Sequence, residues 1–261
     1  MSFVYSSGTL DALHASISSG RLAPYIDAGD GTVEAAVRLY ELNARLSAAF
    51  YSPLQTLEVT VRNAIDQQFR ATFGENWATS GAITLQQQQQ DDIQKAINEL
   101  SLDDQGRPRD FTHDDIVAEL NFGFWVGVLG PKNEVEVWRK SLWRAFPHRP
   151  KGTERKAVQG ALNSIRRLRN RVAHHCRIIH RDLAADHSLI LEVIEWICPD
   201  TRNWAAALST FDVNDIPVPE DVLPMPGLPE AAVDEIVEVK KTKPEPTRSG
   251  RTRLGVRTKA E

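Results

Sequence analysis

The chain has 261 residues, which is long enough for one large domain or two small ones with a sizeable core. Its hydrophobic and charged fractions, 41% and 25%, are ordinary for a soluble globular protein. The net charge of −4 excludes a strongly positive field over the whole molecule, so nucleic-acid binding would need local basic patches.

The N-terminal residues and the cysteines bear on the compartment. We expect no secretory signal, because the first residues lack a basic region followed by an apolar run. We expect no membrane partner, because no apolar stretch is long enough to span a bilayer. Two cysteines, Cys176 and Cys198, make no disulfide framework and favour reduced thiols. These features predict a cytoplasmic protein.

The first half of the chain shows helical periodicity interrupted by turn residues. We expect a turn at Arg21–Tyr25 and a capping box opening a helix at Thr84. Ser52-Pro53 is a typical helix start, with serine as N-cap and proline at the first position. The apolar stripe after it comprises Leu54, Leu57, Val61, Ile65 and Phe69. The predicted helices cover about 9–19, 30–50, 52–73, 84–100 and 112–120.

The second half continues in the same way and then changes character. Helices are predicted over about 133–146, 153–180 and 186–197, the last stopped by Pro199, and no alternating strand pattern is evident. From 212 the chain is rich in proline and then basic, which predicts a disordered tail. We therefore expect an all-α domain over 1–211 and a tail over 212–261.

The strongest pattern is the segment 153–180, which lies in a basic part of the chain. Ten Lys/Arg and one acid, Glu154, occur between Arg149 and Arg181. On one ideal helix, the apolar stripe would hold Leu162, Ile165, Leu168, Val172, Cys176 and Ile179. The opposite face would hold Arg167, Asn170, Arg171, His174, Arg177 and Arg181. A face with histidine and several arginines suits a ligand that contains phosphate.

These residue types fit cleavage of RNA without a metal. Histidine can exchange protons with a 2′-hydroxyl or a leaving 5′-oxygen, and arginine can hold the phosphate. The products would carry a 2′,3′-cyclic phosphate and a 5′-hydroxyl. On an ideal helix, however, Arg169 lies about 140° from His174. Arg169 must then reach round, or the helix is distorted, or the two side chains meet across a dimer.

The segment Leu168–His175 resembles a known signature. It matches the Arg-Asn-x-x-x-His motif of HEPN ribonucleases, in the Leu-Arg-Asn-x-x-Ala-His-His form of the Abi-like abortive-infection family related to the AbiD and AbiF types. Three further segments resemble that family, and the resemblance covers roughly 20–200. They are Leu57-Glu58 with Arg62-Asn63, Phe122-Gly123-Phe124-Trp125, and Leu142-Trp143.

The resemblance implies a HEPN-type helical bundle that cleaves RNA in phage defence or as a toxin. It implies Arg169, Asn170 and His174 as catalytic residues. Supporting roles would fall to His175, Arg171, Glu58 and Arg62, and substrate contacts to Arg167, Arg177 and Arg181. The implied partners are an RNA substrate, a second copy of the chain, and a cognate antitoxin or phage trigger.

Plainer explanations stand beside these roles. Arg169 could form a structural ion pair with Glu58, while Glu58 and Arg62 at i, i+4 could pair within their own helix. We expect no metal and no cofactor, because the histidines at 174, 175, 180 and 187 fit no zinc spacing. The alternative function is a non-catalytic HEPN module that binds RNA or a partner protein.

Overall fold

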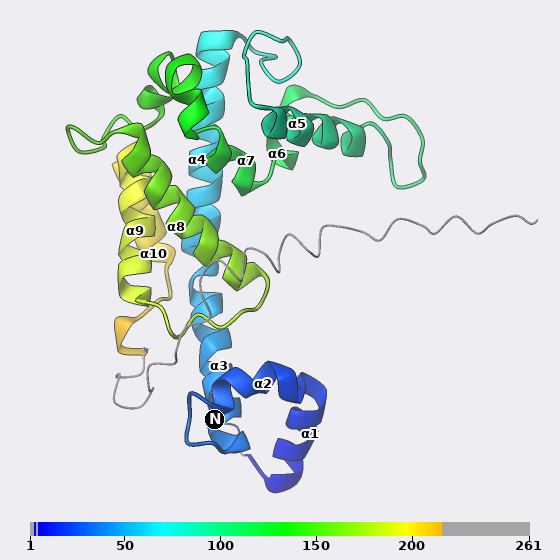
Figure 1. Ribbon diagram of the computed structural model, residues 1–261, viewed down its shortest axis with the longest axis vertical. Coiled ribbons are helices and arrows are strands. Elements are labelled where there is room, and N and C mark those ends of the chain that lie inside the picture. Colours follow the sequence, from blue (N-terminus) through cyan, green and yellow to red (C-terminus); the bar gives the residue numbers. More distant parts are fainter. Residues whose placement is uncertain (1–2, 4, 216–261) are drawn as a thin grey trace, which may run out of the picture. The chain divides into compact units, whose positions relative to one another are not determined.

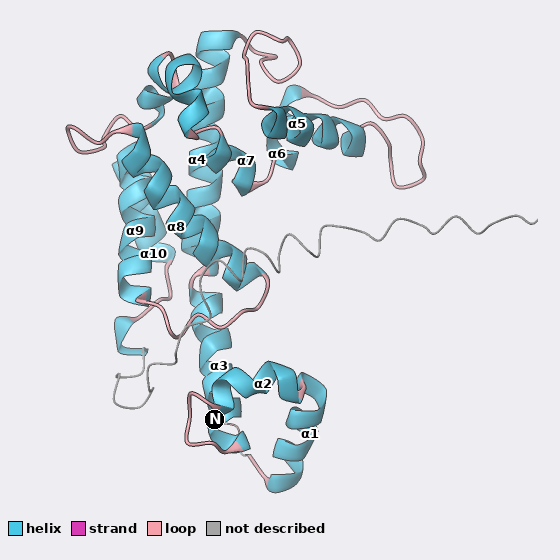
Figure 2. Ribbon diagram, viewed as in Figure 1, coloured by secondary structure: helices cyan, strands magenta, loops and turns pink. Residues whose placement is uncertain are grey.

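The structure, a computed structural model, describes residues 3 and 5–215. These residues form helices joined by loops and turns (Figure 1). Within these ranges the regular secondary structure consists of helices, and no strand is present (Figure 2). The predicted all-α class is therefore confirmed. The predicted tail lies outside the described residues, apart from 212–215, where Val213–Asp215 form a short 3-10 turn.

Two consecutive helices, α3 (Val33–Ala49) and α4 (Tyr51–Phe73), form the scaffold for the other elements. Only Phe50 separates them, and its helical backbone angles let α4 continue from α3 along nearly one line (Figure 1). The expected N-cap at Ser52 was therefore wrong. Pro53 is tolerated because it lies in the first turn of α4, where a backbone N–H would have no hydrogen-bond partner within the helix.

The predicted apolar stripe of α4 is the centre of the core. Leu57, Val61, Ile65 and Phe69 are all completely buried. Helix α9 (Leu183–Ile197) packs along α4, and helix α8 (Arg155–Ala173) contacts both α9 and α4. Burial of this stripe fixes the rotation of α4, so the face that carries Glu58 and Arg62 is turned toward the end of α8.

Two helices appear where turns or stops were expected. Helix α2 (Ser19–Ile26) follows α1 (Ser7–Ile17) in place of the predicted turn, because burial of Leu22 and Tyr25 stabilises a helical turn despite Pro24. Helix α10 (Pro199–Leu208) begins at the proline that was expected to stop α9. Proline is favourable there, since it occupies the first helical position.

The predicted α-helix over 133–146 is replaced by three short helical segments of other types. A 3-10 helix (Pro131–Asn133), a π-helix (Glu134–Arg139) and a second 3-10 helix (Leu142–Ala145) follow one another. The interruption lies at Ser141, which is completely buried and donates its hydroxyl to the Gln68 carbonyl of α4 at 2.9 Å. This tertiary hydrogen bond holds Ser141 out of helical geometry.

The three short helices between α4 and these segments are α5 (Gln87–Leu100), α6 (His113–Glu119) and α7 (Phe122–Gly127). Helix α5 begins after the predicted capping box and has no side-chain cap, so that prediction was wrong. Helix α6 starts at Thr112 as expected, with a complete capping box to Asp115.

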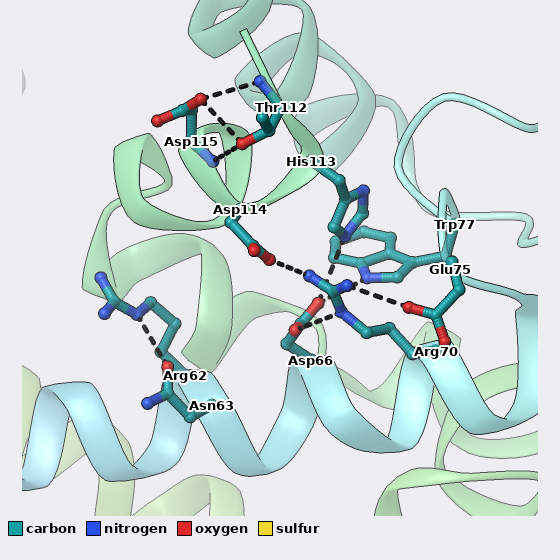
Figure 3. A network of polar contacts seen from close by, with 10 residues as sticks. All are labelled: Arg62, Asn63, Asp66, Arg70, Glu75, Trp77, Thr112, His113, Asp114 and Asp115. Atoms are coloured by element: carbon teal, nitrogen blue, oxygen red, sulfur yellow. Dashed lines mark hydrogen bonds and ion pairs between the residues drawn. The ribbon is translucent and has the colours of Figure 1, made fainter.

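A partly buried carboxylate on α4, that of Asp66, anchors this region (Figure 3). Asp66 accepts hydrogen bonds from Trp77 Nε1 at 2.8 Å and Arg70 Nε at 2.8 Å, and its Oδ1 lies 3.3 Å from His113 Nε2. Arg70 also pairs with Asp114 of α6. The arrangement holds α6 and the 74–77 turn against the C-terminal half of α4, away from Glu58.

Candidate functional site

The Arg-Asn-x-x-x-His segment lies at the end of a helix, not in the middle of one. Helix α8 stops at Ala173, so the single helix predicted over 153–180 was wrong. The His175 N–H donates to the Val172 carbonyl at 3.0 Å, and the Cys176 N–H donates to the Arg171 carbonyl at 2.8 Å. This pair of bonds is a Schellman motif, in which His174 is the C-cap.

His175 takes the left-handed position of this motif, with φ 55°. Glycine usually occupies that position, because a side chain there costs about 1 kcal/mol of backbone strain. Strained non-glycine residues tend to gather at functional sites. The apolar residues Cys176 and Ile179 extend the helical pattern beyond the end of α8. Because no glycine marks that end, the sequence did not predict it.

The chain beyond the motif is fixed to the N-terminal helices. Asn43 of α3, only 4% exposed, accepts a hydrogen bond from the Ile178 N–H at 2.6 Å and donates to the Cys176 carbonyl at 3.4 Å. Arg177 donates to the Pro24 carbonyl at 2.8 Å, and Arg21 donates to the His175 carbonyl. Residues 175–178 are thus held at both backbone and side chains.

The arginines expected on one exposed helical face are therefore distributed differently. Arg171 donates to the Arg177 carbonyl from Nε and Nη2, at 3.1 and 2.8 Å. Arg181 forms an ion pair with the buried Asp186 at 2.7 Å. Arg177 and Arg181 lie beyond the end of α8, whereas Arg167 stays on it, half-buried. A common RNA-facing surface for these residues does not follow from the structure.

Arg169 points instead toward α4. Its Nε lies 3.2 Å from Glu58 Oε2, and its Nη2 lies 3.5 Å from Glu58 Oε1. Both side chains are partly exposed, Arg169 at 37% and Glu58 at 27%. The structural ion pair considered from the sequence is thus present, and it joins the two segments that the sequence singled out separately.

Arg62 is consequently left without the Glu58 partner that the i, i+4 spacing suggested. Its Nε donates to the Asn63 amide oxygen at 3.3 Å, and it stands apart from the Asp66–Arg70 cluster (Figure 3). Among the residues that the structure describes, no carboxylate lies within ion-pair distance of Arg62. This arginine therefore carries an uncompensated positive charge on the same face of α4 as Glu58.

An open groove of about 880 Å³ brings several of these side chains together. It runs between α3, α4 and the end of α8. Of the predicted site residues, Glu58, Arg62, Arg169 and His175 line it. Asn170 and His174 do not. His174 is exposed at the adjacent helix end, and its N–H donates to the Asn170 carbonyl at 2.9 Å.

The groove also contains residues that the sequence analysis missed. Tyr51 and Gln55 recur with Glu58 and Arg62 at intervals of three or four, so the four residues form a second stripe on α4 beside the apolar one. Glu58 and Arg62 were expected in the site from the sequence, whereas Tyr51 and Gln55, at the same spacing, were not. Asn43 gave a weaker signal, as a polar residue within an otherwise apolar helical face.

Two other kinds of feature are absent from the residues that the structure describes. Over residues 3 and 5–215, no group of three or more His, Cys, Asp or Glu side chains is placed to hold a metal ion. Nor does any helix in these ranges combine the length and the apolarity that crossing a membrane requires.

Comparison with known protein families gives a match. A family model described as "Abi-like protein" matches residues 24–180, which is more than half of the chain. The matched range contains the end of α2, the helices α3–α8, the groove and every predicted site residue except Arg181. No curated protein and no solved structure gives a significant match. On the strength of the family model, the chain belongs to the Abi-like protein family.

Proposed function

We propose that this protein is a metal-independent endoribonuclease of the HEPN type, acting in abortive-infection phage defence or as a toxin. The observation that carries the proposal is the position of Arg169-Asn170-x-x-x-His174 at the end of α8. Arg169 lines the groove, while His174 is exposed at the helix end next to it. Both can meet a strand of RNA that crosses this end of α8. Membership of the Abi-like family supports the defence role.

The proposed reaction is an internal transesterification. The RNA 2′-hydroxyl loses its proton to a base and attacks the adjacent phosphorus. The bond from phosphorus to the 5′-oxygen breaks, and this oxygen takes up a proton from an acid. His174 serves these proton transfers, and Arg169 stabilises the charge that develops on the phosphate. Asn170 helps to position His174, because its carbonyl accepts a hydrogen bond from the His174 N–H.

The two neighbouring histidines must be separated by experiment, since His175 lines the groove and His174 does not. Cleavage of bulk RNA in EDTA should be compared for wild type, His174→Ala and His175→Ala. We expect His174→Ala to lose about 10²–10⁴-fold in rate, with its melting temperature nearly unchanged because the side chain is exposed. Full activity in His174→Ala with loss in His175→Ala would transfer the role to His175.

A second candidate function is that of a non-catalytic HEPN module that binds RNA or a partner protein. The ion pair between Arg169 and Glu58 favours this candidate, because it neutralises the cation that would hold the phosphate. The same pair is also consistent with an enzyme held at rest until a phage-derived trigger acts or an antitoxin is lost. Absence of cleavage by wild type and by Glu58→Gln protein would favour the non-catalytic module.

We further propose that the active form is a symmetric dimer that meets at the end of α8. Arg169 and His174 of one chain do not line the same hollow, whereas a two-fold axis near His174 would bring two sets together. Mixing Arg169→Ala with His174→Ala protein, under conditions of subunit exchange, tests this. Partial recovery of cleavage supports a composite site, and a fully active monomer refutes it.

A further inference from the structure

The groove beside the motif is hollow because α3 presents small side chains to it. Ala44, Ser47 and Ala48 recur at helical spacing on the groove face of α3. The opposite wall is formed by larger residues of α4 and by Val172 and Ala173 of α8. With a volume of about 880 Å³, the space is comparable to pockets that hold small organic ligands.

The walls of the groove are largely apolar and yet open to solvent. Tyr51 is 66% exposed and Val59 is 38% exposed, although both are large and apolar. They line the same hollow, together with Tyr40 and Leu54. Apolar surface gathered in a concave site usually marks a place where a ligand binds.

The charged groups of the groove, two arginines and one glutamate, are basic on balance. Arg62 has no carboxylate at ion-pair distance among the described residues, and Glu58 is already neutralised by Arg169. Gln55 adds an amide that can both donate and accept hydrogen bonds. A complementary ligand therefore combines a flat apolar body, hydrogen-bonding edges and a negative charge.

We infer that this groove is a nucleotide subsite, which takes one unpaired base of an RNA strand on Tyr51 while Arg62, about three helical turns further along α4, holds a phosphate further along the same strand. The inference rests on the proposed function, because it identifies how that site positions its substrate. Single-stranded RNA is recognised in this way, by stacking of splayed bases on aromatic side chains and by hydrogen bonds to base edges. Gln55, one helical turn from Tyr51 on the side toward Arg62, would meet the base edge.

A nucleotide fits the groove better than a second protein surface does. An apolar protein surface would cover Arg62 without supplying a carboxylate, and burial of an uncompensated charge is costly. An RNA strand covers the apolar wall with a base and brings one of its phosphates to the arginine. It also directs the strand toward His174, at the end of α8.

The test measures binding without cleavage. The probe is a short fluorescein-labelled oligonucleotide with 2′-O-methyl riboses, which lacks the 2′-hydroxyl that the proposed reaction consumes. Ala44→Phe fills the groove, Tyr51→Ala removes the stacking ring, and Arg62→Gln removes the charge. Ala71→Phe is the matched control, since Ala71 is also an exposed helical alanine but does not line the groove.

We expect Ala44→Phe and Tyr51→Ala to weaken binding about tenfold or more, as loss of one stacked base does. Arg62→Gln should also weaken binding and reduce the slope of log affinity against log salt by about 0.7. Ala71→Phe should bind like wild type. If Ala44→Phe does not fold, Tyr51→Ala decides alone, because its exposed ring contributes little to the core.

Other outcomes overturn the inference. Unchanged affinity in Tyr51→Ala and Ala44→Phe does so, as does an equal loss in Ala71→Phe. A shift of Ala44→Phe in oligomeric state with unchanged affinity would instead identify the groove as a contact between copies of the chain. The ribonuclease proposal fails separately, if wild-type protein binds the probe through the groove but never cleaves RNA.

Discussion

Replacing Asn43 with alanine should destabilise the protein and release the histidines from their positions. Asn43 is 4% exposed and accepts the Ile178 N–H at 2.6 Å, while its bond to the Cys176 carbonyl is long, at 3.4 Å. Loss of the short bond leaves a buried N–H without an acceptor, which costs about 1–3 kcal/mol. The long bond adds little. We therefore expect a loss of about 2–3 kcal/mol.

For a domain of this size, such a loss lowers the melting temperature by about 5–10 °C. Thermal unfolding followed by circular dichroism measures it, and hydrogen exchange of a peptide covering 174–182 should show reduced protection at Ile178. Asn98→Ala is the control, because Asn98 is an exposed helical asparagine that accepts a hydrogen bond from Gln94. A melting temperature and exchange pattern equal to wild type in Asn43→Ala would refute the reasoning.

Three further predictions follow from the same region and from α9. His175→Gly should be about 0.5–1 kcal/mol more stable than His175→Ala, because glycine alone relieves the left-handed backbone; equal unfolding curves would contradict this. Burial lowers the pKa of His187 below its usual value of 6.5. The stability that the neutral imidazole contributes is therefore present above pH 6.5 and is lost as the pH falls. His187→Gln should flatten the dependence of the urea unfolding midpoint on pH across this range. Deleting 217–261 should leave the melting temperature nearly unchanged, because that sequence has no core pattern; a large drop would show that it packs on the helices.

Helical periodicity alone predicted the parts of the fold in which one face is continuously buried. The stripe from Leu57 to Phe69 is a clear example, since a fully buried row leaves no choice of rotation for α4. The interruption at Ser141 could not be predicted in this way, because it depends on a hydrogen bond to the distant Gln68 carbonyl. Nor could α10, whose first residue is a proline compatible with both a stop and a start.

The candidate site shows the same division between local and distant information. Arg169 and His174 were singled out by their resemblance to a family signature, and the pairing of Arg169 with Glu58 was considered as an alternative. The positions of Arg177 and Arg181 were not predictable. The helix ends at a histidine in the left-handed conformation, where a glycine would have indicated the end but none is present. Once α8 ends, angles on a helical wheel no longer apply to anything beyond it.

The weakness of the Glu58–Arg169 pair reconciles it with a phosphate-binding role for Arg169. Both side chains are more than a quarter exposed, and ion pairs with that degree of solvation contribute about 0–1 kcal/mol. An RNA phosphate entering the groove would compete with Glu58 at little cost. Arg62, which needs no such exchange, would meet the strand first. The phosphate would attract the Arg169 guanidinium and repel the Glu58 carboxylate, so the two side chains of the pair would separate as the strand arrives.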